Sequence, residues 1–121
     1  MNRFGHIDLR VHDIVAAQEF YEALLPALGF TERYHGERWK VWGGTDSYFG
    51  VTESTEHRAN ENRIAFAVES NAEVERLAEI VRAAGALELT GPKKMPYGPD
   101  YYAIFFADPS GNRLEVYFRS D

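Results

Sequence analysis

The hexapeptide HIDLRV at residues 6–11 is matched 57 residues further along the chain by RIAFAV at residues 63–68. This weak internal repeat determines the predicted architecture. In both copies apolar residues alternate with polar or small ones, which is the period of a strand with one buried face. The segments that follow also fall into register, so the chain is predicted to contain two copies of one structural unit.

A helical pattern follows each repeated strand. In the first half Asp13 is a predicted N-cap, and apolar residues continue at helical spacing as far as Pro26, which is expected to kink or end the last turn. In the second half Ser70 and Glu73 form an S-x-x-E capping box, and the helix that they begin is expected to stop at Gly85. We therefore predict one helix in each half.

Three short runs rich in aromatic and β-branched residues follow each helix and are predicted to be strands. They cover about residues 31–35, 38–42, 47–52, 87–90, 101–107 and 113–118. Each half therefore reads βαβββ, and the predicted fold class is α+β, with two tandem modules forming a curved mixed sheet around a cleft. We expect one domain over residues 1–121, with module 1 at about 1–55 and module 2 at about 61–121.

Two irregular stretches separate the predicted elements. The polar segment ESTEHRANEN at residues 53–62 is expected to be a solvated linker between the modules. The segment GPKKMPYGPD at residues 91–100 holds three prolines and two glycines and is expected to be a loop. A loop of that length inside a small domain is either functional or a plain surface connection.

Composition restricts the kind of protein. The 121 residues are 45% hydrophobic, which fits one domain with a substantial core. Thirteen basic and nineteen acidic residues give a net charge of −6, so nothing indicates a nucleic-acid partner. Cysteine is absent, which excludes disulfides and cysteine-ligated metals. No apolar run reaches the length of a membrane span and the chain does not start with a secretory signal, so we expect a cytoplasmic protein with no membrane partner.

Strand alternation predicts which side chains face away from the helices and line the cleft. The first strand and its repeat contribute His6, Asp8, Arg10 and Arg63, and the last strand contributes Arg113, Glu115 and Tyr117. Asp8 and Arg10 either pair with neighbouring strands or contact a substrate. Tyrosines beside the proline-rich segment either close over a ligand or pack structurally, and these are Tyr97, Tyr101 and Tyr102.

Two segments resemble a known family. GHIDLRVHDIVAAQEFYEALLPALGF at residues 5–30 and DPSGNRLEVYF at residues 108–118 are similar to the vicinal oxygen chelate superfamily. This superfamily includes glyoxalase I, bleomycin-resistance proteins, fosfomycin-resistance proteins and extradiol dioxygenases. The resemblance covers nearly the whole chain and implies paired modules that curve into a cup, a homodimer, and commonly one divalent metal ion held by equivalent strands.

The resemblance also implies where a metal would be held. His6 matches the first-strand ligand and Glu115 the last-strand carboxylate, which would also be the catalytic residue. Arg63 stands where a further ligand is expected, and Gly50 occupies the counterpart of Glu115. Two protein ligands would bind Mn, Ni, Zn, Mg or Fe weakly, and a guanidinium repels a cation. We consider two further arrangements: an Arg63–Glu115 ion pair in place of the metal, with His6 as a third member, or His57 as a third ligand.

Two functions therefore stay open. One is a divalent-metal-dependent lyase or isomerase of the glyoxalase type, similar to lactoylglutathione lyase, or a ring-cleaving dioxygenase, acting on a small oxygenated substrate. The other is metal-free binding or sequestration of a small molecule, as in the bleomycin-resistance relatives. In that case Arg63 would bind an anionic group of the ligand, and tyrosine side chains would line the pocket. The candidates are Tyr97, Tyr102 and Tyr117.

Overall fold

Two βαβββ modules follow one another along the chain, as the repeat predicts. The computed structural model describes residues 4–121. Module 1 contains β1 (His6–Val11), α1 (Ile14–Ala27), β2 (Glu32–His35), β3 (Trp39–Gly43) and β4 (Tyr48–Glu53). Module 2 contains β5 (Arg63–Ala67), α2 (Asn71–Ala83), β6 (Leu87–Lys94), β7 (Tyr102–Ala107) and β8 (Arg113–Phe118). The predicted α+β class is confirmed.

Each module forms its own mixed four-stranded sheet. The strand orders are β1-β4-β3-β2 and β5-β8-β7-β6, with β1–β4 and β5–β8 parallel and the other neighbours antiparallel. Asp8 pairs with Gly50 in the first sheet, and Ala65 pairs with Glu115 in the second. Because Asp8 and Ala65 are equivalent in the repeat, this register makes Gly50 the structural counterpart of Glu115.

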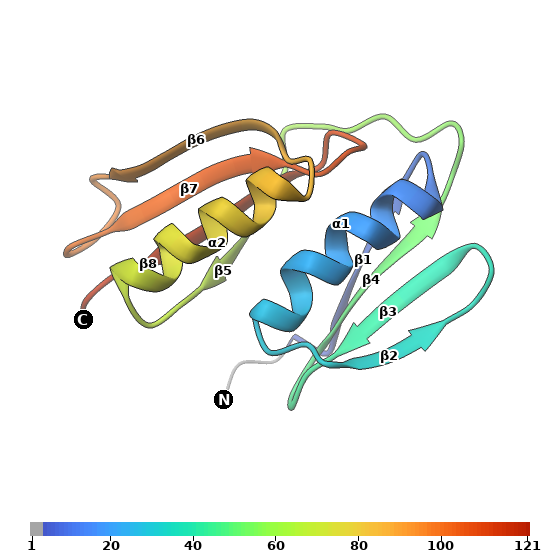
Figure 1. Cartoon of the computed structure of the whole chain (residues 1–121), viewed down its shortest axis with the longest axis horizontal. Helices are drawn as coiled ribbons and strands as arrows, with labels where there is room; N and C mark the ends of the chain where they lie inside the picture. Colours follow the sequence, from blue (N-terminus) through green and yellow to red (C-terminus); the bar gives the residue numbers. More distant parts are fainter. Residues whose placement is uncertain (1–3) are drawn as a thin grey trace.

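Both helices cover the same side of the two sheets and lie side by side in Figure 1. One hydrophobic core joins them, because buried residues of α1, α2 and the helix-facing sides of both sheets form a single cluster. Its largest fully buried side chains include Trp42, Tyr21, Phe20, Phe49 and Leu24. Each such side chain contributes about 1.5–3 kcal/mol relative to exposure, so the shared core holds the modules together.

The predicted caps begin both helices. The Asp13 carboxylate accepts hydrogen bonds from the backbone N–H groups of Val15 and Ala16. In module 2 the Ser70 hydroxyl accepts from the Glu73 N–H, while the Glu73 carboxylate accepts from the N–H of Glu69, one residue before the cap. The Asp13 and Ser70 side chains thus satisfy backbone donors that a helix start leaves without intrahelical partners, and the Glu73 contact fixes the residue that precedes the cap.

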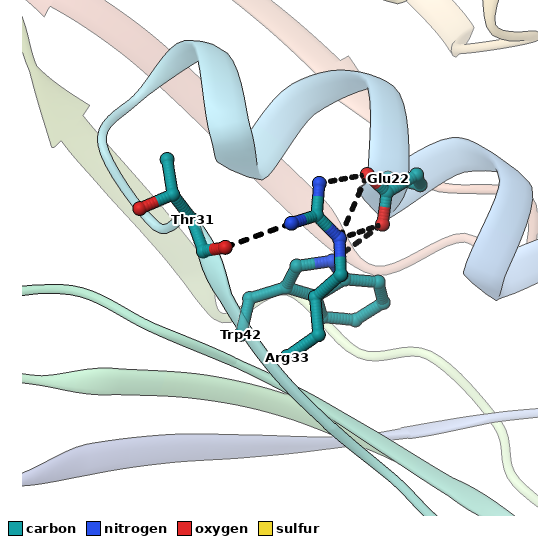
Figure 2. Close-up of polar contacts among 4 residues, drawn as sticks. All are labelled: Glu22, Thr31, Arg33 and Trp42. Atoms are coloured by element: carbon teal, nitrogen blue, oxygen red, sulfur yellow. Dashed lines mark hydrogen bonds and ion pairs between the residues drawn. The ribbon is translucent and has the colours of Figure 1, made fainter.

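A polar cluster attaches α1 to its sheet, as Figure 2 shows. The Glu22 carboxylate on α1 accepts hydrogen bonds from the Arg33 guanidinium on β2 and, at 3.0 Å, from the indole N–H of Trp42 on β3. Arg33 also donates to the backbone carbonyl of Thr31 at 2.7 Å. The hydrogen bonds from Arg33 are the main reason that the pKa of Glu22 is lowered to about 2.

The second-module strand predicted to end at residue 90 continues as β6 to Lys94, so this part of the proline-rich segment is strand and not loop. β6 is an edge strand, and its pairing with β7 is shifted twice, between Leu87 and Thr90 and between Thr90 and Lys93. An edge position and local irregularities are the places where a sheet accepts a proline, because no ladder donor is required there. The composition of the segment therefore misled the prediction.

Candidate ligand-binding site

The helices leave one face of each sheet uncovered, and we call these two surfaces the open faces. On the first sheet, alternation places the side chains of His6, Asp8, Tyr48, Thr52, Trp39 and Val41 on the open face. On the second sheet, the corresponding positions hold Arg63, Glu115, Tyr117 and Phe105. The open faces therefore hold side chains that alternation assigns to the cleft, among them His6, Asp8, Arg63 and Glu115, while their role in one shared cleft stays a prediction.

Two adjoining cavities surround His6. The first, of about 370 Å³, lies on the open face of the first sheet and is lined by His6, Ile7, Asp8, Trp39, Val41, Tyr48, Gly50 and Thr52. The second, of about 410 Å³, lies where β1 and β4 approach β5, and its lining includes Phe4, Phe30, Phe66 and Arg63. His6, Ile7 and Tyr48 line both cavities. We call this pair the His6 cavities.

Arg63 lines the second of these cavities and is exposed. Its guanidinium carbon lies 5.1 Å from the centroid of the Phe105 ring, which is a cation–π distance. The expected Arg63–Glu115 ion pair is absent among residues 4–121, since no nitrogen of Arg63 lies within 4.0 Å of that carboxylate. In the sheet, Glu115 stands between Ala65 and Phe105, and Arg63 packs on the aromatic ring.

Glu115 is buried, with 6% exposure, and lines neither of the His6 cavities. Its carboxylate accepts a short hydrogen bond from the Tyr101 hydroxyl. Burial, followed by this hydrogen bond, raises the pKa of Tyr101 well above its ordinary value. Tyr101 also stacks on Tyr117, with ring centroids 4.8 Å apart, and meets the exposed Tyr97 edge to face. These residues form a separate tyrosine cluster around Glu115.

The other residues predicted to contact a substrate, Asp8, Arg10 and Tyr102, do not gather at one site. The Asp8 carboxylate accepts from Arg10 on the same strand at 3.0 Å and from the Thr52 hydroxyl on β4 at 3.1 Å, so both residues have structural partners. Tyr102 donates to Glu75 of α2 at 3.0 Å and therefore lies on the helix side of its sheet, away from the open face. The structure thus brings together His6, Asp8 and Arg63, while the tyrosines form other contacts.

The donor set does not fit a divalent metal ion at the position that the resemblance implies. His6 supplies one imidazole, Arg63 supplies a positive charge, and Glu115 is engaged by Tyr101. At Gly50, an added Cβ would lie 2.9 Å from a methyl group of Val41, so a larger residue would have to displace that side chain. Among residues 4–121, no three His, Asp or Glu side chains gather in an arrangement that could hold a metal.

Several residues that matter at the site and around it were not identified from the sequence. Tyr48, Phe30 and Phe66 line the cavities, and only the alternation of β4 gave a signal for Tyr48. The sequence also offers His57 as a third ligand beside His6, but the structure places the His57 ring 5.5 Å from that of His12. In the described part of the chain, no helix is long and apolar enough to cross a membrane.

The chain belongs to the Glyoxalase/Bleomycin resistance protein/Dioxygenase superfamily, whose family model matches residues 3–116. An uncharacterized protein of Bacillus subtilis (strain 168), YqjT, is 28% identical over 121 residues, covering 92% of this chain and 94% of its own.

Solved structures support the same fold. A glyoxalase/bleomycin resistance protein from Albidiferax ferrireducens T118 is similar with a TM-score of 0.84 at 22% identity, covering 98% of this chain and 100% of its own. The fosfomycin resistance protein FosX from Mesorhizobium loti is similar with a TM-score of 0.75 at 19% identity, covering 99% and 94%. At these identities the likeness concerns the fold, because activity depends on the side chains of each protein's own site.

Proposed function

We propose that the protein binds a small organic molecule in the His6 cavities and does so without a metal ion. The observation that carries this proposal is the pair of adjoining hollows of about 370 and 410 Å³, walled mainly by aromatic and aliphatic side chains. Sites for small molecules have this character, with volumes of about 300–1,000 Å³ and few polar groups.

The polar groups of the cavities favour an aromatic ligand that carries an anionic group. Arg63 has no carboxylate partner among the described residues, so its charge is available to a ligand. The Asp8 carboxylate, in contrast, is already neutralised by Arg10 and accepts from Thr52. Trp39 and Tyr48 are 44% and 46% exposed, which leaves their rings accessible to a flat apolar body.

The alternative, a metal-dependent lyase or isomerase of the glyoxalase type, needs His6 and Glu115 to act on one ion. In the chain, Glu115 lies in the tyrosine cluster and His6 in the cavities. A guanidinium at position 63 also opposes a cation, by several kcal/mol at close range in a poorly hydrated site, roughly according to Coulomb's law. The side chains present therefore support ligand binding more strongly than metal-dependent catalysis.

A titration with 1-anilinonaphthalene-8-sulfonate, an aromatic anion, tests the proposal. We expect saturable binding to the folded protein, with quenching of Trp39 fluorescence measured in a Trp42→Phe background. Arg63→Gln should weaken the affinity about tenfold, the loss of one charged contact. The matched control Arg82→Gln, on α2, should leave it unchanged. Equal affinity in the two arginine variants, or no saturable binding, would contradict the proposal.

The variant Glu115→Gln separates the two functions. Under the binding proposal, the affinity for the dye is retained, because Glu115 does not line the cavities. Under the metal-dependent alternative, titration with Mn²⁺ or Ni²⁺ shows one ion whose binding is lost in both His6→Ala and Glu115→Gln. Circular dichroism confirms that each variant is folded before it is compared.

We further propose that the protein is a cytoplasmic homodimer, following the superfamily resemblance. Light scattering during size-exclusion chromatography gives the mass in solution and would exclude the dimer if it equals that of one 13.8 kDa chain. Fractionation of producing cells tests the location.

A further inference from the structure

The linker between the modules folds back against the end of β1 and brings two histidines together. His12 directly follows β1, and His57 lies in the irregular stretch between β4 and β5. Their ring centroids are 5.5 Å apart, and both line a shallow cavity of about 550 Å³ together with Thr55, Glu56 and Arg58. The cavity beside this histidine pair shares no lining residue with the His6 cavities, and the pair has no role in the proposed function.

The hydrogen bonds around His57 determine which of its ring nitrogens is free. Nε2 lies 2.9 Å from Oδ1 of Asn112, and the Asn112 amide nitrogen donates to the backbone carbonyl of Arg10 and to Asp108. Since Asn112 uses its nitrogen in those contacts, its oxygen faces His57 and accepts. Nε2 of His57 therefore carries the proton, and Nδ1 presents a lone pair. Metal-binding histidines are typically held in this way by a partner on their other nitrogen.

The ring separation matches chelation of one ion. A tetrahedral zinc ion about 2.0–2.1 Å from one nitrogen of each ring holds the two centroids roughly 5 Å apart. The observed 5.5 Å is close to this separation, and the rings are inclined by 54°. His12 is exposed, so its ring can turn toward the ion without displacing core residues. Among the described residues, its ring nitrogens make no hydrogen bond that a metal would have to replace.

We propose that His12 and His57 form a binding site for a divalent transition-metal ion such as Zn²⁺, Ni²⁺ or Cu²⁺. Imidazole nitrogen is a preferred ligand of these ions. The two imidazoles are the protein ligands, and water completes the coordination; the carboxylate of Glu56 lines the same cavity and contributes its negative charge without acting as a ligand. Arg58 lines the cavity as well, so its charge and that of Glu56 offset each other. With two histidines the site binds more weakly than a closed four-ligand zinc site.

Bound metal would join three parts of the chain. His12 belongs to the end of the first strand, His57 to the linker, and Asn112 to the turn before the last strand of module 2. An ion bound to the folded arrangement stabilises it relative to the unfolded chain in proportion to the logarithm of its concentration over Kd. The expected consequence is a protein whose melting temperature rises when Zn²⁺ or Ni²⁺ is added.

Isothermal titration with Ni²⁺ at neutral pH tests the proposal, and the four histidines of the chain provide matched controls. We expect one ion per chain, with the affinity reduced at least tenfold in His12→Gln and in His57→Gln. His6→Gln and His35→Gln should bind as the unchanged protein does. Loss of binding in His6→Gln, or no uptake by the unchanged chain, would overturn the assignment. Binding of the dye in the His6 cavities is measured in the same variants, so failure of one proposal is distinguished from failure of the other.

A second measurement needs no substitution. Substoichiometric Cu²⁺ broadens nuclear magnetic resonance signals near the ion, because the ion is paramagnetic. The backbone signals of residues 12, 57 and 112 should disappear first in the unchanged protein. Broadening centred on residues 6 or 35 would exclude the site.

Discussion

Replacement of Asp108 by alanine should destabilise the protein more than any substitution of an exposed carboxylate. Asp108 is fully buried and directly follows the strand β7, which ends at Ala107. Its carboxylate accepts from the Tyr21 hydroxyl of α1 at 2.6 Å, from the N–H groups of Ser110 and Asn112, and from the Asn112 side-chain amide. Because Asn112 also donates to the carbonyl of Arg10, the aspartate connects module 2 to both α1 and β1 of module 1.

The magnitude follows from the donors that lose their acceptor. Tyr21 is fully buried, so its hydroxyl has no access to water and costs about 1–3 kcal/mol when unsatisfied. The donors of Asn112 and Ser110 are partly buried, and the contacts that they lose are charge-assisted hydrogen bonds. The total loss for Asp108→Ala is therefore about 3–5 kcal/mol, at the upper end for single substitutions.

The variant Asp108→Asn should lose less, about 2 kcal/mol, because one oxygen still accepts from the turn while the new amide meets the amide of Asn112. Tyr21→Phe should lose about 1–2 kcal/mol. Since the residues are in contact, the double variant Tyr21→Phe/Asp108→Ala should lose less than the sum of the single losses.

Urea unfolding followed by tryptophan fluorescence measures these losses, with Asp46→Ala, at an exposed position, as the control. A loss for Asp108→Ala no larger than the control, or strict additivity with Tyr21→Phe, would refute the reasoning.

Burial, and then the charge and hydrogen bond of Asp108, raise the pKa of Tyr21 well above its ordinary value. A raised pKa gives stability that is complete below pH 10 and is lost as the pH rises further, and Tyr21→Phe should reduce that alkaline loss.

Other substitutions test separate parts of the structure. The pKa of Glu22 is lowered to about 2, so its contribution is present above the unfolded value of 4.5 and is lost as the pH falls from there toward 2. Because the Glu22 side chain is 39% exposed, solvent screens its ion pair with Arg33. In Glu22→Gln the loss of stability between pH 4.5 and 2 should therefore be smaller by less than about 1 kcal/mol, as measured by urea unfolding between pH 2 and 7. Gly50→Ala should cost about 1–3 kcal/mol, since its Cβ would lie 2.9 Å from Val41, and should weaken dye binding in the fluorescence titration. Asp13→Ala should cost about 1 kcal/mol by loss of the α1 cap, and an unchanged unfolding midpoint would contradict the assigned cap.

Local patterns were sufficient to predict most of the fold. Alternation in residues 6–11 and 63–68 identified β1 and β5, and Asp13 and Ser70 identified the helix starts. These signals are local, because strand period and capping depend on residues close together in the chain. The extension of β6 to Lys94 was missed because a proline is acceptable only at an edge, and strand order is not a local property.

The site was predicted less completely, for a reason that Arg63 and Glu115 illustrate. Alternation shows on which face of a sheet a side chain lies, but not which neighbour it contacts or what covers it. Both residues lie on one open face, yet the guanidinium packs on Phe105 and the carboxylate receives the Tyr101 hydroxyl. A prediction from opposite charges alone leaves out these aromatic residues. Phe105 contacts Arg63 and Tyr101 contacts Glu115, so the two charged groups do not meet. Arg63 therefore carries a positive charge with no carboxylate partner among residues 4–121, and this absence is the basis of our proposal that the ligand of the His6 cavities carries an anionic group.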